Sequence, residues 1–300
     1  MNLGDITNSQ EYISFRSSVP LKKIVVDSNS SRCWKIYDSG PKTVTTPLVC
    51  LPPVSGTADV YFKQILALSA KGIRVISAEH PVYWTVNQFC EGLKTLLDYL
   101  GIDKIHIFGA SLGGFLAQKF AEYTSHCPRV SSLILCNAFI DTTVFNYNES
   151  AAVFWVCPSL VLKKMVMGNF TAEHSDIRII QSVDFMVDRL DSLSQQDLAS
   201  RLTLNCVNCY VEPQKLSSVE SITIIDVFDD YAISSPVREE MYKCYPNAKL
   251  AHLKSGGNFP YLSRSDEVNL HIQIHLRRYK DTISSPFEPT TKVISGSSSS

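Results

Sequence analysis

The stretch Gly109-Ala110-Ser111-Leu112-Gly113 constrains the fold of this chain more than any other feature of its sequence. It stands directly after the apolar run 105–108 and directly before the segment 112–123, in which apolar residues recur at helical spacing. A glycine on each side of the serine allows the helix to pack close against the preceding strand. The sequence therefore predicts a tight strand–turn–helix junction with Ser111 at its tip.

Short apolar runs and helical patterns alternate along most of the chain. None of the runs alternates cleanly between apolar and polar residues, which is typical of parallel strands that are buried on both faces. Ahead of them, the segments 21–27 and 33–40 predict a hairpin. The sequence thus predicts an α/β fold, with a mainly parallel sheet and helices on both faces. The predicted parallel strands lie near residues 46–51, 73–78, 104–108, 130–136, 221–227 and 248–253.

The alternation stops between residues 140 and 218, where the pattern is helical. We interpret 140–218 as a helical cap inserted over the carboxyl ends of the strands, and 12–139 with 219–280 as the core domain. Residues 281–300 are rich in Ser, Pro and Thr and predict a disordered tail. The most apolar part of the cap, 151–170, leaves two interpretations open: a helix over a pocket, or a surface that meets a peptide or a membrane.

Charge and composition argue against several classes of function. The formal net charge is −1, with both signs spread along the chain, so there is no electrostatic case for a nucleic-acid partner. No apolar run reaches the roughly 18 residues of a membrane span, and the N-terminal segment lacks the pattern of a signal peptide. We therefore expect a cytosolic protein with reduced thiols, whose contact with membranes is peripheral. Cys206 and Cys209 lack partners at metal-ligand spacing, so we expect no metal and no cofactor.

The serine turn has the sequence of the nucleophile turn of serine hydrolases, in which the chain order is serine, acid, histidine. The N–H of Leu112 begins the following helix and is expected to face an oxyanion. The loop after the first core strand carries the pair Pro52-Pro53, and Pro53 has no N–H to give. The second oxyanion donor is therefore expected from Val54 or Ser55.

The acid and the base are expected after the last two strands. Asp229 and Asp230 follow the strand 221–227 and are the candidate acids; the alternative is a pair of solvated turn carboxylates. The base position falls in a Gly-x-Phe-Pro loop and holds Asn258. An amide has no pKa near neutral pH, so Asn258 cannot take the proton of Ser111.

Other histidines are candidate replacements for the base. His106 and His252 are expected within strands, away from the loops that surround the serine. His80 follows the strand 73–78 at the correct end of the sheet and is the best stand-in, although nothing in the sequence fixes its distance from Ser111.

The order of these elements resembles the α/β-hydrolase family. The runs "PLKKIVVD", "FGASLGGFLAQKFAEYT", "EEMYKCYPNA" and "GGNFPYL" are similar to one branch of that family, over roughly residues 12–280. The resemblance implies a non-catalytic, cytosolic protein that is partly peripheral on endosomal and trans-Golgi membranes. It also implies a protein partner, the cytoplasmic tail of a T-cell co-receptor. The rival hypothesis is a weak cytosolic serine esterase or lipase that uses Ser111, an aspartate and an unusual base.

Overall fold

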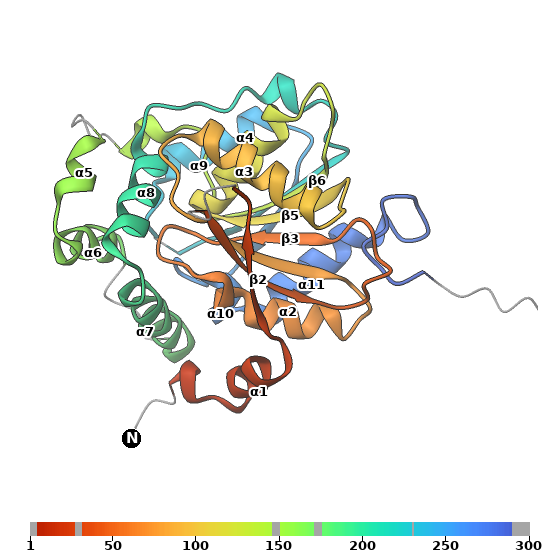
Figure 1. Ribbon diagram of the computed structural model, residues 1–300, viewed down its shortest axis with the longest axis horizontal. Helices are drawn as coiled ribbons and strands as arrows, with labels where there is room; N and C mark the ends of the chain where they lie inside the picture. Colours follow the sequence, from red (N-terminus) through yellow and green to blue (C-terminus); the bar gives the residue numbers. More distant parts are fainter. Residues whose placement is uncertain (1–4, 28–31, 146–150, 171–175, 230, 290–300) are drawn as a thin grey trace, which may run out of the picture.

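The computed structural model describes residues 5–27, 32–145, 151–170, 176–229 and 231–289. An eight-stranded sheet in the order β1-β2-β4-β3-β5-β6-β7-β8 forms its centre (Figure 1). β2 is antiparallel to β1 and β4, and the remaining pairs are parallel, which confirms the predicted fold class. The strands are β1 Leu21–Val25, β2 Cys33–Ser39, β3 Leu48–Leu51, β4 Val75–Glu79, β5 Ile105–Ala110, β6 Val130–Cys136, β7 Ser221–Val227 and β8 Lys249–Leu253.

Helices cover both faces of the sheet. In Figure 1, α3, α4 and α9 lie on one side of the strands, and α1, α2, α10 and α11 lie on the other. The helices on each side pack against the sheet and bury an apolar cluster. Phe115 of α4 belongs to one cluster and Phe62 of α2 to the other. The helices of the two layers are α1 Gln10–Ser18, α2 Phe62–Ser69, α3 Val86–Tyr99, α4 Leu112–Tyr123, α9 Ser235–Cys244, α10 Pro260–Ser263 and α11 Ser265–Arg277.

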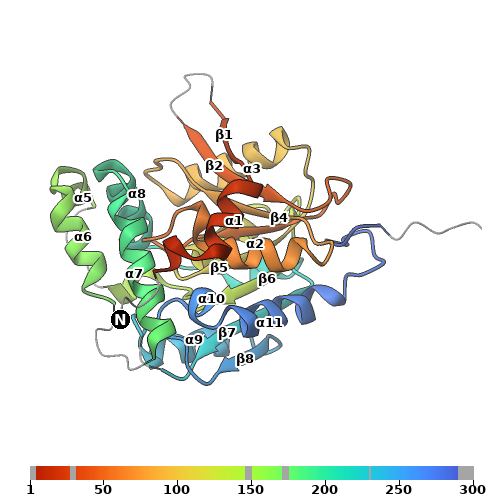
Figure 2. The same ribbon diagram turned by 90° about the horizontal axis from the view of Figure 1, so that it is seen from below.

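The segment between β6 and β7 forms a helical lobe beside the sheet (Figure 2). It has an apolar cluster of its own, which includes Leu162, Leu190 and Leu198. Its described residues carry no strand, although an isolated bridge joins Asp141 to Tyr210. The cap boundaries given above stay a prediction. The helices of the lobe are α5 Ala152–Val156, α6 Ser159–Met167, α7 Ile177–Asp191 and α8 Gln195–Cys206.

The C-terminal segment differs in part from the prediction of a disordered tail over 281–300. Residues 281–289 are ordered, because their backbone pairs with the residues that precede β4: the N–H of Arg74 donates to the carbonyl of Pro286 at 3.2 Å, and Phe287 bridges Ile73. Residues 290–300 lie outside the described residues. None of the described helices has the length and apolar character needed to cross a membrane.

Candidate functional site

The turn between β5 and α4 has the geometry that its sequence predicts. Ser111 has a φ of 49° and a ψ of −117°, a region that residues other than glycine rarely adopt. Its N–H donates to the carbonyl of Cys136 at 3.0 Å. Gly113 lies so close to the end of β3 that a Cβ there would collide with the carbonyl oxygen of Leu51. The turn therefore holds Ser111 in a strained backbone at the carboxyl end of the central strand.

The loop after β8 carries Asn258, the residue that the sequence predicts at the base position. Oδ1 of Asn258 accepts the N–H of Ala232 at 2.9 Å, and Nδ2 lies 3.4 Å from the carbonyl of Asn169 in the cap. The side chain of Asn258 is thus engaged with backbone groups of two neighbouring segments. Both contacts use the amide as a donor and acceptor of hydrogen bonds, and neither requires a basic group.

Asp229, one of the two candidate acids, holds this loop. Its Oδ2 accepts the N–H of Gly256 at 2.6 Å and the N–H of Gly257 at 2.9 Å. The sequence left two possibilities for Asp229, a catalytic acid or a solvated turn carboxylate. In the structure its carboxylate binds the backbone of the loop that carries Asn258. Asp230 lies outside the described residues.

Asn137 was not foreseen from the sequence, and it braces the same loop from the end of β6. Its φ of 44° is again unusual. Its Nδ2 donates to the carbonyl of Gly257 at 3.0 Å and lies 3.4 Å from that of Asn258. Its Oδ1 is buried and finds no hydrogen-bond partner among the residues that the structure describes. The only sequence signal was its position directly after a predicted strand.

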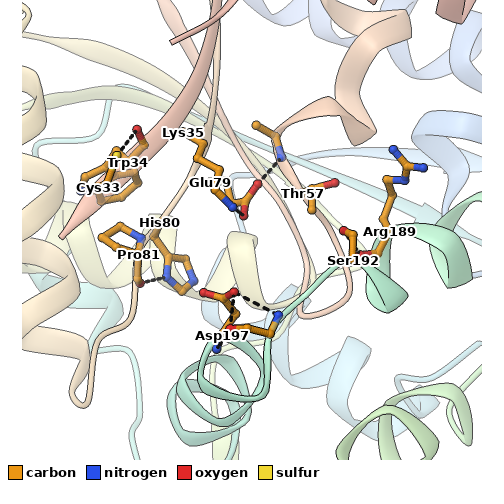
Figure 3. Close-up of polar contacts among 12 residues, drawn as sticks. Cys33, Trp34, Lys35, Thr57, Glu79, His80, Pro81, Arg189, Ser192 and Asp197 are labelled. Atoms are coloured by element: carbon orange, nitrogen blue, oxygen red, sulfur yellow. Dashed lines mark hydrogen bonds and ion pairs between the residues drawn. The ribbon is translucent and has the colours of Figure 1, made fainter. Parts of the chain in front are cut away.

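A buried arginine from the cap fixes the loop that follows β3. Arg201 of α8 is 1% exposed, and its Nη1 donates to the carbonyls of Val54 at 2.9 Å and Gly56 at 2.5 Å. Its Nη2 lies 3.6 Å from Oε1 of Glu79, whose Oε2 accepts the N–H of Ala58 at 3.1 Å. Figure 3 shows Glu79 with this bond and its ion pair to Lys35. The conformation of the loop is therefore set by the cap, while donation to an oxyanion by Val54 or Leu112 stays a prediction.

These segments line a cavity of about 300 Å³ beside Ser111, which is partly open to solvent. None of the described residues in its wall is an Asp, Glu, Lys, Arg or His. Four asparagines supply most of its polar groups. The wall consists of Pro53, Val54, Ser55, Ala110, Ser111, Asn137, Val144, Phe145, Met165, Val166, Asn169, Phe170, Leu202, Asn205, Cys206, Tyr231, Ala232, Ile233, Asn258 and Phe259.

The interpretation of His80 as a stand-in base is wrong. His80 does not belong to the cavity wall. Its ring packs edge-on against Phe89 with the centroids 5.4 Å apart, and its Nδ1 donates to the carbonyl of Pro81 at 2.7 Å (Figure 3). Burial lowers the pKa of His80 to about 4, with the nearby Arg201 acting in the same direction. His80 is a neutral ring in an aromatic cluster.

His106 and His252 also lie away from Ser111, as predicted. His106 is buried in β5, between the hydroxyl of Ser132 at 2.7 Å and the carbonyl of Ser284 at 2.8 Å. Burial lowers its pKa to about 4. His252 is exposed on β8, where its ring stacks on Phe228 with the centroids 5.1 Å apart.

Cys206 is the member of the Cys206–Cys209 pair that reaches the cavity, at the end of α8. Burial raises the pKa of its thiol to about 11, so the thiol is protonated at neutral pH. Within the described ranges, no group of three or more His, Cys, Asp or Glu side chains is placed to hold a metal ion.

Comparisons with known proteins agree with this architecture. The family model for the alpha/beta hydrolase fold matches residues 46–166. Maspardin from Mus musculus is 58% identical over 288 residues, which are 96% of this chain and 93% of the relative. Maspardin from Danio rerio is 58% identical over 280 residues, 93% of this chain and 90% of the relative.

Two solved structures show the same fold at low identity. A thermophilic esterase from Thermogutta terrifontis has a TM-score of 0.71 at 17% identity, covering 86% of this chain and 98% of its own. The enol-lactonase from Burkholderia xenovorans LB400 has a TM-score of 0.70 at 18% identity, covering 85% of this chain and 100% of its own.

Proposed function

Since the chain belongs to the maspardin family of proteins with the α/β-hydrolase fold, we propose that it is a non-catalytic binding protein built on a hydrolase frame. The observation that carries this proposal is the side chain at the base position. Asn258 stands where the frame needs a proton acceptor, and its amide is engaged with the N–H of Ala232. The chain has the hydrolase fold and the serine turn, but at this position it lacks the imidazole that would activate Ser111.

The missing base outweighs every feature that favours catalysis. In subtilisin, loss of the histidine alone lowers kcat by about 10⁶. The described wall of the cavity offers no substitute, since it contains no carboxylate, imidazole or amine. The strained backbone of Ser111 and the N-terminus of α4 cannot compensate, because one oxyanion donor is worth only about 10²–10³ in rate.

The cap supplies the surface that we propose for the partner. Val156 is 81% exposed and Leu160 63% exposed, and Val161 is also exposed on α6. Lys164 lies one turn further along α6 than Leu160 and Val161 and is exposed. An apolar strip beside a lysine suits an extended peptide with apolar side chains and acidic groups.

The identity of the partner and the location in the cell are proposed from the family resemblance. The partner is the cytoplasmic tail of a T-cell co-receptor, bound by a cytosolic protein that is peripheral on endosomal and trans-Golgi membranes. The exposed strip on α5 and α6 supports a peptide ligand, and Lys164 is suitably placed for anionic head groups.

The catalytic question is tested with a short-chain p-nitrophenyl ester and a fluorophosphonate probe. We expect hydrolysis at the background rate and no labelling, because Ser111 keeps its proton. The Ser111→Ala variant is the control and should behave as the unmodified protein does. Turnover well above background that Ser111→Ala abolishes would replace this proposal with the alternative, a weak serine esterase.

The partner surface is tested by titrating a peptide of the receptor tail. Leu160→Glu places a charge in the exposed strip of α6 and should weaken binding at least tenfold. Leu270→Glu is the matched control, since Leu270 is similarly exposed, at 54%, but lies on α11. Equal binding by both variants and the unmodified protein would exclude this strip as the contact surface.

A further inference from the structure

The strand β8 ends the sheet, and one of its two faces is open to solvent (Figure 2). Among the described residues it pairs with β7 alone. Ala251 and Leu253 are buried in the apolar cluster on the side of α11. Leu250 and His252 point to the opposite face, where both are exposed, Leu250 at 49%. An apolar side chain thus lies uncovered at the margin of the sheet.

The backbone of β8 offers hydrogen bonds on its outer side. The carbonyl of Leu253 accepts the N–H of Phe228 at 3.1 Å, so the backbone groups of Leu253 face β7. Backbone groups of successive residues alternate between the two sides of a strand, and those of Leu250 and His252 therefore face outward. A row of outward N–H and C=O groups is a template on which another strand can pair.

An aromatic pair continues the exposed surface beside this edge. Phe228 is 68% exposed, and its ring stacks on that of His252 with the centroids 5.1 Å apart and the planes inclined by 9°. The hydroxyl of Tyr242 in α9 lies 3.3 Å from Nε2 of His252 and holds the stack from the other side. We call Leu250, His252 and Phe228 the β8 patch. Its rings are already ordered before any partner binds.

We propose that β8 pairs antiparallel with β8 of a second copy of this chain. With the two-fold axis at Ala251, Leu250 of each copy lies opposite His252 of the other, and each of these two pairs exchanges two backbone hydrogen bonds. Ala251 lies opposite its own copy, at a pair where the strands come closest and a small side chain fits. The two β8 patches then form one apolar and aromatic surface. None of their residues lines the cavity, so the proposal does not depend on the reactivity of Ser111.

The charges of the two edge strands favour a second copy at β8 and disfavour one at β1. In the register centred on Ala251, Lys249 and Lys254 lie opposite apolar residues of the second copy, so no lysine faces a lysine. The middle residue of β1 is Lys23, which the equivalent pairing would place opposite itself. Like charges directly opposite each other destabilise a strand pair. The β8 edge is therefore self-complementary, and the β1 edge is not.

Association is tested by sedimentation equilibrium of the full chain. One pair of edge strands makes a small interface, so we expect a monomer–dimer equilibrium with a dissociation constant in the micromolar range. Dimerisation doubles the mass of 33.5 kDa. A chain that stays monomeric at about 200 µM, well above the concentration at which such an interface forms, would overturn the proposal and leave β8 to a strand of another protein or to solvent. Growth beyond a dimer would overturn it as well.

The contact surface is tested by a charge in the β8 patch. Leu250→Lys must bury a lysine opposite His252 of the second copy, and it should weaken dimerisation about tenfold or more. Leu21→Lys is the matched control, because Leu21 is 40% exposed on the other edge strand, and it should leave dimerisation unchanged. Equal dimerisation of both variants and the unmodified protein, or equal loss in both variants, would exclude β8 as the contact. A melting temperature for each variant separates loss of folding from loss of association.

The pairing of backbones is tested at the same position. Leu250→Pro deletes an outward N–H that the sheet of one copy does not use, but it removes two of the four backbone hydrogen bonds between the copies. Leu250→Ala is the matched control, since it shortens the side chain and keeps the N–H. We expect the proline variant to dimerise more weakly than the alanine variant. Equal dimerisation of the two would mean that the strands do not pair, and it would overturn the proposed geometry.

Discussion

The turn that carries Ser111 and the loop that carries Asn258 form two walls of one cavity. They resemble the active site of a serine hydrolase in different respects. The turn keeps both the strained backbone and the nucleophile side chain. The loop keeps only its backbone placement, which Asp229 and Asn137 secure through four hydrogen bonds to Gly256, Gly257 and Asn258. The comparison teaches that positioning and proton transfer are separable: the first is encoded by many backbone contacts, the second by one side chain.

Restoring the base is the strongest way to break this comparison. If the two walls differ from those of an active enzyme chiefly in one side chain, Asn258→His should make Ser111 reactive. General-base assistance is worth about 10²–10⁴ in rate, so we expect fluorophosphonate labelling to rise by a factor in that range. The measurement is the rate of labelling at pH 7.5 relative to the unmodified protein.

The double variant with Ser111→Ala should remain unlabelled and shows that the probe reports on this serine. A labelling rate unchanged by Asn258→His would mean that the loop after β3 has also lost its function. In that case the Pro52-Pro53 pair, and not Asn258 alone, would account for the lack of activity that we propose.

The loop after β3 forms a third wall of the cavity, and Arg201 of the cap holds it in place. Arg201→Met removes two charged hydrogen bonds to the carbonyls of Val54 and Gly56, and we expect a loss of about 3 kcal/mol in the free energy of unfolding. Glu79 keeps Lys35 as a partner, at 2.9 Å, which limits the loss. Urea denaturation measures the effect.

Arg178→Met is the matched control, because the Arg178 side chain is 63% exposed and should change stability by less than about 0.5 kcal/mol. Equal stability of the Arg201 and Arg178 variants would show that the cap does not hold this wall.

The sequence predicted those features that are local. The parallel strands are apolar runs, and the serine turn is a contiguous motif, so both could be located without knowledge of the packing. The assignment of Asn258 to the base position rests on an equally local signal, the Gly-x-Phe-Pro pattern of its loop, and it stays a prediction. Each of these signals lies within a few consecutive residues.

The features that the sequence did not predict depend on contacts between distant segments. Asn137 lies 120 residues from Gly257, and Arg201 lies 147 residues from Val54. α1 was not predicted, because only Tyr12 and Phe15 of that helix are buried, and their partners come from later segments. The ordering of 281–289 has the same origin, since its backbone pairs with residues that precede β4.

The amino ends of β5, β6 and β7 offer a contrast with the cavity, whose described wall residues carry no charge, and they predict a pH dependence. His106 and His275 both contact the hydroxyl of Ser132 at 2.7 Å, and Thr223 contacts the other ring nitrogen of His275. His106 donates through Nε2 to the carbonyl of Ser284, so its Nδ1 must accept from Ser132, and His275 must then donate to Ser132. Nδ1 of His275 then accepts from Thr223, and all of these hydrogen bonds are satisfied with two neutral rings.

Burial lowers the pKa of His106 to about 4 and that of His275 to about 3. Both values lie below 6.5, so the unfolded state binds protons first as the pH falls, and stability is lost below about pH 6.5. Between pH 7 and pH 5 we expect each histidine to contribute a loss of about 2 kcal/mol. His106→Gln should remove its share, which urea denaturation at the two pH values measures. The same pH dependence in His106→Gln and in the unmodified protein would contradict this origin.

The smallest effect is expected from the carboxylate that holds the base loop. Asp229→Ala removes the acceptor of the N–H groups of Gly256 and Gly257, and because Asp229 is half-buried, water can replace part of that interaction. We therefore expect a loss of about 1 kcal/mol in the free energy of unfolding. Asp103→Ala is the control, since the Asp103 side chain is 90% exposed and its removal should have almost no effect on stability.

The comparison of the serine turn with the Asn258 loop makes a sharper prediction. Asp229→Ala should also reduce the labelling gained by Asn258→His, because the new imidazole would stand on a loop that is no longer fixed. Labelling that is as fast without Asp229 would show that the loop needs no brace to position a base, and the separation of positioning from proton transfer would no longer hold for this site.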